Sequence, residues 1–256
     1  MIDIHAHLLP EVDDGAPDMK SSLIMAKAAV ENGVHTMIVT PHSNRKDFFK
    51  NYLNENLEKR FVDLQKAVER EQIPLRILPG MEIYGTKIVP DLLRKGKLIS
   101  LNRSRYILLE FGREDNAKLM NYIINELVYM GYYPIIAHPE KYPYVQNDPD
   151  IVYGWIAKGC FLQVNKDSFL GNFGKRTKKT AFQLLNGNLV SIVASDAHGI
   201  EHRTTDLSKV YQLLSDIYTD YYANILLEEN PRRVVENLDL IPVLPLVSLR
   251  YQSASS

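Results

Sequence analysis

The chain of 256 residues contains a single cysteine, Cys160, and this excludes an intramolecular disulfide framework. One thiol in a chain of this length fits a reducing compartment. The net charge is −1 and like charges do not form long runs, so the sequence gives no reason to propose a nucleic acid as partner. Met1 leads directly into an apolar strand, and the apolar stretches fall short of the ~20 residues that span a bilayer. We therefore expect a soluble, cytoplasmic protein with no membrane insertion.

Several catalytic motifs are also missing from the chain. There is no Gly-x-Ser-x-Gly nucleophile turn, no Gly-x-x-x-x-Gly-Lys-Ser/Thr phosphate loop and no dinucleotide-binding glycine fingerprint. A cysteine-dependent phosphatase needs an arginine six positions after its nucleophile, and that position holds Lys166. Cys160 begins an apolar run, where burial raises the pKa of a thiol. We therefore interpret Cys160 as a core residue.

Short apolar runs alternate with longer amphipathic segments along most of the chain. Seven of these runs predict strands, and their nearly continuous hydrophobicity is typical of parallel strands buried on both faces. The predicted strands are Ile2–Ile4, Thr36–Thr40, Leu75–Leu78, Tyr106–Phe111, Tyr133–Ala137, Cys160–Val164 and Leu189–Ala194. Repeated β-α units of this kind form an α/β barrel or a doubly wound sheet.

The segments between the predicted strands show helical periodicity. Asp18 is placed to cap a helix that stops at Gly33, and the apolar residues of 53–68 follow one helical face. Further helices are expected over 116–130, 148–158, 175–186 and 205–218. Because the chain has no Gly/Ser-rich linker and no internal repeat, we expect one domain over residues 1–240. The tail, 241–256, is expected to be partly disordered.

Two histidines end the first predicted strand. Because strand side chains alternate between faces, His5 and His7 point the same way and can converge on one ion. Asp196 and His198 repeat this spacing after the last predicted strand. A parallel β/α barrel carries its active site at the carboxyl ends of its strands, and six of the seven predicted strands end in a histidine or an acidic residue. This convergence predicts a metal centre at the mouth of a barrel.

Nine imidazole and carboxylate side chains are the candidate metal ligands. They are His5, His7, Asp14, His42, Glu82, Glu110, His138, Asp196 and His198. Such ligands without a thiolate favour Mn, Fe or Zn. Two ions about 3.5–4 Å apart can share a hydroxide and clamp an in-line displacement, with Glu82 as a candidate bridge. Only one residue of the pair Asp13-Asp14 can face the site, and for Asp14 and His42 solvation in a loop is an equally good explanation.

Two cations follow proposed ligands closely. Arg203 lies five residues after His198, and Lys141 comes shortly after His138. Arginine offers a bidentate fork to a phosphate, and lysine offers a point charge. We interpret both as phosphate contacts, although solvated loop charges would explain the same positions.

Seven sequence blocks together resemble the polymerase and histidinol phosphatase (PHP) superfamily. More narrowly, they resemble the manganese-dependent tyrosine-protein phosphatases of capsule and exopolysaccharide operons in Gram-positive bacteria. The blocks are Asp3-Ile-His-Ala-His7, Asp13-Asp-Gly15, Thr40-Pro-His42, Gly80-Met-Glu-Ile83, Leu109-Glu-Phe111, Ala137-His-Pro-Glu140 and Ala194-Ser-Asp-Ala-His198. The resemblance covers residues 1–240 and implies a distorted (β/α)7 barrel of the TIM type, the PHP fold, with three metal ions.

The resemblance also implies roles for individual residues. One ion would be held by His5, His7, Glu82 and Asp196. A second would be held by Glu82, Glu110 and His138, and a third by Asp14, His42 and His198. The implied cofactor is Mn²⁺, with Fe, Co or Zn as alternatives in single sites. Arg203 matches the arginine that contacts the substrate phosphate, whereas many relatives have arginine where this chain has Lys141, and the segment after Phe111 lacks their proline-containing loop.

These observations lead to one hypothesis and two alternatives. The hypothesis is a metal-dependent phosphomonoesterase that hydrolyses phosphotyrosine with a metal-activated hydroxide and without a phosphoenzyme. The resemblance implies that its substrate is the tyrosine-rich tail of a bacterial tyrosine kinase that controls polysaccharide synthesis. One alternative is a small-molecule phosphatase such as a histidinol-phosphate phosphatase. The other is a non-catalytic metal-binding module that docks on the kinase.

Overall fold

The computed structural model describes residues 1–45 and 48–242, and every pairing between its named strands is parallel. The strands in this part of the chain are β1 (Ile2–Ala6), β2 (Thr36–Val39), β3 (His42–Ser43), β4 (Arg76–Pro79), β5 (Glu82–Tyr84), β6 (Tyr106–Glu110), β7 (Tyr133–Ala137), β8 (Phe161–Asn165) and β9 (Ile192–Ala194). They form a sheet of order β1-β2-β4 and a sheet of order β3-β5-β6-β7-β8-β9.

At two of the seven strand positions the strand is interrupted, and a second short strand follows the interruption. β2 gives way to β3 across Pro41, which has no N–H to donate to a ladder. β4 gives way to β5 across Gly80, where an added Cβ would lie 2.7 Å from Ile38 Cγ2. The outer pieces pair with each other in the larger sheet, so His42 stands opposite Glu82. The breaks therefore bring two predicted ligands side by side.

The last strand position returns to the first. The Asp196 N–H donates to the His5 carbonyl oxygen at 2.8 Å, and Ala6 and Ala197 form a parallel bridge. With β2/β3 and β4/β5 each counted as one position, seven positions close into a ring. The expected distorted (β/α)7 barrel is confirmed.

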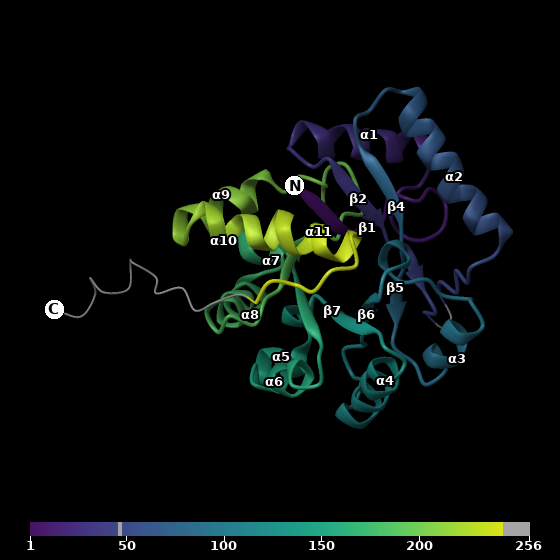
Figure 1. Ribbon diagram of the computed structural model, residues 1–256. Coiled ribbons are helices and arrows are strands. Elements are labelled where there is room, and N and C mark those ends of the chain that lie inside the picture. Colours follow the sequence, from purple (N-terminus) through teal and green to yellow (C-terminus); the bar gives the residue numbers. More distant parts are fainter. Residues whose placement is uncertain (46–47, 243–256) are drawn as a thin grey trace.

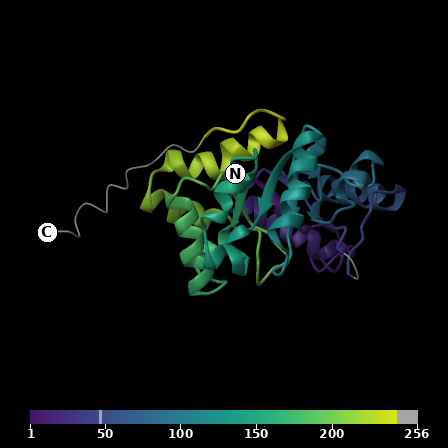
Figure 2. The same cartoon turned by 90° about the horizontal axis from the view of Figure 1, so that it is seen from below.

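Helices surround the strands (Figure 1). They are α1 (Met19–Glu31), α2 (Glu55–Arg70), α3 (Val89–Arg94), α4 (Ala117–Tyr129), α5 (Pro143–Asn147), α6 (Ile151–Ile156), α7 (Lys166–Leu170), α8 (Lys175–Asn186), α9 (Ser208–Ile217), α10 (Asp220–Asn224) and α11 (Asn230–Val235). In Figures 1 and 2, α2 and α8 lie on opposite sides of the strands. Among the described residues, no helix has the length and apolar character needed to cross a membrane.

The longer helices begin and pack as the sequence predicts. Asp18 caps α1 by accepting the Ser21 N–H at 2.7 Å, which satisfies one of the free N–H groups of the first turn. The predicted apolar face of α2 is buried along its length. The helix predicted over 148–158 is shorter in the structure and corresponds to α6, and a separate short helix, α5, precedes it. The short helices α3, α5, α7, α10 and α11 were not predicted, since five or six residues show too little periodicity.

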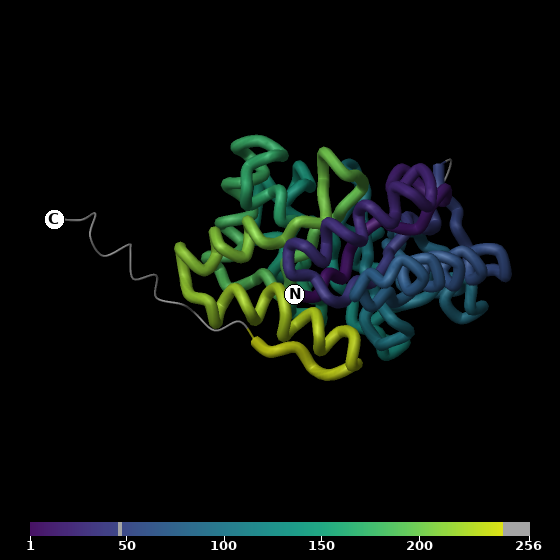
Figure 3. Tube along the Cα trace, turned by 90° about the horizontal axis from the view of Figure 1, so that it is seen from above, coloured from purple at the N-terminus to yellow at the C-terminus, as the bar shows by residue number. Residues whose placement is uncertain are grey.

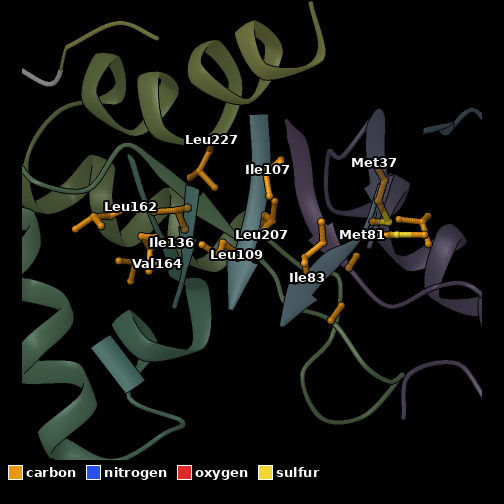
Figure 4. Close-up of a cluster of buried hydrophobic side chains, with 14 of the residues drawn as sticks. Met37, Met81, Ile83, Ile107, Leu109, Ile136, Leu162, Val164, Leu207 and Leu227 are labelled. Carbon is orange, nitrogen blue, oxygen red and sulfur yellow. The ribbon is translucent and has the colours of Figure 1, made fainter. Parts of the chain in front are cut away.

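Alternate residues of the strands pack into two separate clusters. Ile107 and Leu109 of β6 belong to the cluster between strands and helices, part of which is drawn in Figure 4. Tyr106 and Leu108 belong to a second cluster inside the barrel. Glu110 continues this second series, because strand side chains alternate with a period of two. The Glu110 carboxylate therefore lies at the mouth of the barrel, above its apolar interior.

The amino-terminus lies beside the carboxyl-terminal helices (Figure 3), where the Met1 ammonium is 3.2 Å from Glu228. The Tyr106 hydroxyl donates to the Leu238 carbonyl oxygen at 2.6 Å and fixes the segment after α11. From residue 243 onward, the tail that we predicted to be partly disordered lies outside the described residues.

Candidate metal centre

The nine predicted ligands meet at the carboxyl ends of the strands. Four groups of side chains bring their possible ligand atoms within 4.8 Å of one another. The groups are His7, Asp14, His42 and His198; His5, His7 and Asp196; His5, Glu82 and His138; and His42, Glu82 and Glu110. Each of the nine residues occurs in at least one group. The groups share members and therefore form one continuous cluster.

The two histidines of β1 are held by partners behind them. The Nδ1 atom of His5 is 2.9 Å from Gln163 Oε1, and the Nδ1 atom of His7 is 2.7 Å from Asp13 Oδ2. With Nδ1–H donating to these acceptors, Nε2 of each ring faces the cluster and is the nitrogen that can bind an ion. The two Nε2 atoms lie 3.3 Å apart, and that of His5 is 3.3 Å from both Glu82 Oε1 and Asp196 Oδ1. Nitrogen and oxygen atoms that can each bind a cation therefore face one another.

Glu82 lies at the centre of the cluster. Its Oε1 is 2.9 Å from His138 Nε2, and its Oε2 is 2.7 Å from His42 Nδ1. Burial alone would raise the pKa of Glu82, but the neighbouring His5 and His42 hold it well below its usual range. An ionised carboxylate with one oxygen turned to each side is the geometry that a bridging ligand needs.

Unpartnered polar atoms test whether these residues fit a metal. Among the described residues, the buried atoms without a hydrogen-bond partner include Glu110 Oε2 and His198 Nε2, whereas Glu82 Oε2, Asp196 Oδ1 and His42 Nδ1 have only close ionic contacts. Buried polar atoms in proteins normally have a partner. Imidazole nitrogens and carboxylate oxygens are ligands that suit Mn, Fe, Co and Zn. The residues present fit a cluster of divalent ions.

One ligand set implied by the resemblance falls within a single group of the structure, and a second does so except for Glu82, which is grouped with His5 and His138. Asp14, His42 and His198 lie together with His7, and His5 and His7 lie with Asp196. The set of Glu82, Glu110 and His138 is divided among the described residues. Glu110 lies with His42, at 3.8 Å, and His138 lies with His5. The assignment of ligands to individual ions stays a prediction.

The pair Asp13-Asp14 is resolved by the structure. The Asp13 side chain is buried, and it accepts from the Gly15 N–H at 3.0 Å as well as from His7. The Asp14 side chain is 55% exposed, with Oδ1 3.4 Å from His42 Nε2 and 3.5 Å from His198 Nε2. Asp14 therefore faces the cluster, while Asp13 caps the turn and supports His7.

Sequence analysis missed two residues of β8, the strand position without a predicted ligand. Gln163 contacts His5, and Asn165 Nδ2 donates to Asp196 Oδ2 at 2.6 Å. Both side chains are fully buried. The available signal was the alternation of two amides with apolar residues at the end of a buried strand.

The backbone is left-handed at three positions around the cluster. His138, Asp196 and Arg203 have φ values of 36°, 51° and 48°. This conformation costs about 1–2 kcal/mol for a residue with a side chain and persists where neighbouring contacts enforce it. The His198 N–H donates to the Arg203 carbonyl oxygen at 2.8 Å and closes one of these turns. The turn aims Arg203 back towards Asp196.

A cavity of about 480 Å³ opens beside the cluster. Arg203 Nη2 is 2.7 Å from Asp196 Oδ1, and Lys141 Nζ is 3.4 Å from Asp196 Oδ2. Both predicted phosphate contacts therefore line this cavity, each about one-third exposed. Phe173 forms part of the wall, with Lys141 Nζ 5.1 Å from its ring centroid. Arg45 and Arg113 add positive charge to the lining.

Comparisons with known proteins agree with this geometry. The chain is 37% identical over 243 residues to the tyrosine-protein phosphatase YwqE of Bacillus subtilis, covering 94% of this chain and 91% of that protein. It is 31% identical over 240 residues to the tyrosine-protein phosphatase CpsB of Streptococcus pneumoniae, covering 92% and 98%. A solved structure, from work on YwqE and CpsB as metal-dependent tyrosine phosphatases, matches with a TM-score of 0.87 at 34% identity, covering 96% of this chain and 98% of the other.

More distant structures share the fold alone. A lactonase from Listeria monocytogenes matches with a TM-score of 0.52 at 9% identity, covering 93% of this chain and 92% of the lactonase. The family model for capsular polysaccharide synthesis, CpsB/CapC, matches residues 1–236. The chain therefore belongs to the CpsB/CapC family, as the resemblance to phosphatases of capsule operons predicted.

Proposed function

We propose that this chain is a metal-dependent phosphomonoesterase that hydrolyses phosphotyrosine in a protein with a metal-activated hydroxide. The observation that carries the proposal is the contact of His5 Nε2 with Glu82 Oε1 and Asp196 Oδ1, three possible metal-binding atoms beside a cavity lined by four cationic side chains, Lys141 and Arg203 among them. The relatives that match more than nine-tenths of this chain are named tyrosine-protein phosphatases. Metal dependence is stated for the solved relatives.

The proposed cofactor is Mn²⁺, in a three-ion site held by the nine clustered side chains. When bound, such ions supply a hydroxide at neutral pH and neutralise phosphoryl oxygens. Fe, Co or Zn suit the same ligands in single positions. The residues behind the ligands, Asp13 and Gln163, hold His7 and His5 in the orientation that binding requires.

The residues of the chain itself bind and orient the phosphate. Arg203 offers two parallel N–H donors to its equatorial oxygens, and Lys141 adds a point charge on the same side. Asp196 holds both cations at the cavity, at 2.7 and 3.4 Å. Donors placed in advance where negative charge develops are a large source of catalytic rate.

A side-chain nucleophile is not needed. Cys160 is buried in the core, and burial raises the pKa of its thiol to about 12. It is absent from the lining of the cavity. Direct attack by water-derived hydroxide without a phosphoenzyme is consistent with these facts.

Two features favour an aromatic phosphate in a protein. The Phe173 ring lines the cavity and gives a phenyl group an aromatic surface on which to pack. The phenol group of tyrosine has a pKa of about 10, so its phenolate is a better leaving group than an alkoxide and needs less help from a general acid. We propose that the substrate is the tyrosine-rich tail of a bacterial tyrosine kinase that regulates capsular or exopolysaccharide synthesis in the cytoplasm. The family's role in capsular polysaccharide synthesis supports this partner.

The test compares two substrates on the Mn²⁺-loaded protein. We expect kcat/KM for a phosphotyrosyl peptide to exceed that for histidinol phosphate at least about tenfold. A single contact that favours one substrate changes the ratio of kcat/KM values by about this factor. Asp196→Ala is the matched inactive control, because it removes a candidate ligand. Preference for histidinol phosphate would assign the chain to the small-molecule phosphatases. Wild-type protein that turns over neither substrate with any divalent metal would be a non-catalytic module.

A further inference from the structure

We propose that the side-chain amides of Gln163 and Asn165 form a positioning relay that links His5 to Asp196 and sets the affinity of the site for its cation. The relay rests on the proposed function only in taking His5 and Asp196 as metal ligands. The side-chain contacts of the two amides run to each other and to these two ligands.

The relay is a continuous chain of three hydrogen bonds. The Asn165 Nδ2 donates to Asp196 Oδ2 at 2.6 Å, and the Gln163 Nε2 donates to Asn165 Oδ1 at 2.8 Å. At the other end, Gln163 Oε1 lies 2.9 Å from His5 Nδ1. The four side chains are at most 1% exposed, so water cannot replace these contacts.

The direction of the hydrogen bonds is fixed from one end. An ionised carboxylate can only accept, so Asn165 must turn its NH₂ group to Asp196. The Asn165 oxygen then faces Gln163, whose NH₂ donates to it and whose own oxygen faces His5. That oxygen can only accept, so His5 Nδ1 carries a proton, and Nε2 is the ring nitrogen left to bind a cation. The relay thus places a proton on His5 Nδ1 and turns His5 Nε2 towards Asp196 Oδ1, 3.3 Å away.

The charge of each supporting residue matches its surroundings. His7 is supported by the carboxylate of Asp13, at 2.7 Å. His5 already faces two carboxylates, Glu82 and Asp196, each at 3.3 Å. A neutral amide behind His5 supplies the acceptor without adding a third negative charge to a buried site. Gln163 therefore orients the His5 ring without adding a charge, and the negative charge around the ring comes from Glu82 and Asp196.

The geometry of β8 suits this role. Gln163 and Asn165 are two positions apart, so both face the barrel interior. They stand opposite Ile192 and Ala194 of β9, the strand that leads directly into Asp196. β8 contributes none of the nine candidate ligands, and its two inward amides instead join the ligand of β1 to the ligand that follows β9.

The experiment measures Mn²⁺ binding by chelator-stripped, full-length protein, with free Mn²⁺ followed by electron paramagnetic resonance. We expect Gln163→Met and Asn165→Leu to weaken the tightest Mn²⁺ site about 10–100-fold, the usual effect of losing a residue that supports a ligand. Gln65→Met is the matched control, because the Gln65 amide donates at 2.9 Å to the Ile77 carbonyl oxygen, away from the cluster.

A second readout reports the tautomer directly. In long-range ¹H–¹⁵N spectra of the stripped protein, His5 should carry a proton at Nδ1, and Gln163→Met should lose this preference. A merely structural role would lower the Tm of Gln163→Met and Gln65→Met alike and leave the tautomer unchanged. Mn²⁺ affinity in Gln163→Met equal to that of wild type would overturn the proposal, as would a wild-type His5 without a proton at Nδ1.

The relay and the phosphatase proposal fail separately. Wild-type protein that binds Mn²⁺ but hydrolyses no phosphoester, with weakened binding in the relay variants, would refute only the phosphatase. An active wild type whose relay variants bind Mn²⁺ normally would refute only the relay. A wild type that binds no divalent metal would refute both.

Discussion

A methyl group at position 15 has no space in this fold. A Cβ on Gly15 would lie 2.2 Å from the His7 carbonyl oxygen and 2.5 Å from His7 Cβ. Contacts below 3.0 Å essentially never occur, so the backbone must move by close to 1 Å. The Gly15 N–H donates to Asp13 Oδ1, and the Ala16 N–H donates to the His7 carbonyl oxygen, each at 3.0 Å. The movement therefore disturbs the loop that supports His7 and presents Asp14.

Two effects of Gly15→Ala follow from this displacement. Overpacking costs about 1–3 kcal/mol, which for a chain of this size lowers Tm by roughly 2–4 °C per kcal/mol. A misplacement near 1 Å at a reaction centre costs about 10²-fold. We expect kcat/KM for a phosphotyrosyl peptide to fall about 100-fold, and Mn²⁺ affinity to fall with it.

Gly154→Ala is the matched control for this variant. Gly154 lies in α6, and an added Cβ there would meet nothing within 4 Å. Because alanine favours a helix over glycine by up to about 1 kcal/mol, this variant should keep full activity and an equal or higher Tm. Steady-state kinetics and thermal unfolding of both variants test the reasoning. Gly15→Ala with wild-type kcat/KM and Tm would show that the predicted clash is absent.

Three further predictions concern single side chains. Arg203→Ala should lower kcat/KM about 10²–10³-fold at unchanged Tm, because it removes the bidentate phosphate contact, and a loss below tenfold in steady-state assays would remove Arg203 from that role. Lys141→Arg should be tolerated or mildly activating, and a large loss of kcat/KM would contradict its place beside the phosphate. Burial raises the pKa of the Cys160 thiol from 9.0 to about 12, so the stability it contributes is complete below pH 9 and is lost as the pH rises towards 12. Urea unfolding from pH 8 to 11 should therefore show a steeper loss for wild type than for Cys160→Ala, and equal slopes would contradict this burial effect.

The sequence predicted the place of the site better than its internal geometry. The alternation of strand side chains and the rule that barrels function at their carboxyl ends brought His5, Glu110 and Asp196 to one mouth. The breaks at Pro41 and Gly80 were not predicted, because the pieces beyond them are only two or three residues long. Those breaks set His42 against Glu82 and Glu110, so distances between ligands depend on backbone features that the hydrophobic pattern does not carry.

The supporting residues could not be identified from the sequence for a different reason. Gln163 and Asn165 are amides, and only imidazole and carboxylate side chains were considered as ligands. The predicted strand also ended at Val164, one residue before Asn165. Their role depends on β8 lying beside β9, which in turn contacts β1. Asp13 and Asp14 are alike in sequence terms, and only the turn at Gly15 determines which of them faces the cluster.

The most direct test of the account measures bound metal and phosphate release on the same samples. Protein stripped with EDTA is reloaded stepwise with Mn²⁺, and each sample is analysed for Mn²⁺ per chain and for turnover of a phosphotyrosyl peptide. The account predicts no turnover in the stripped protein and a return of activity as the clustered side chains fill with ions. Undiminished turnover by protein that contains no transition metal would contradict it.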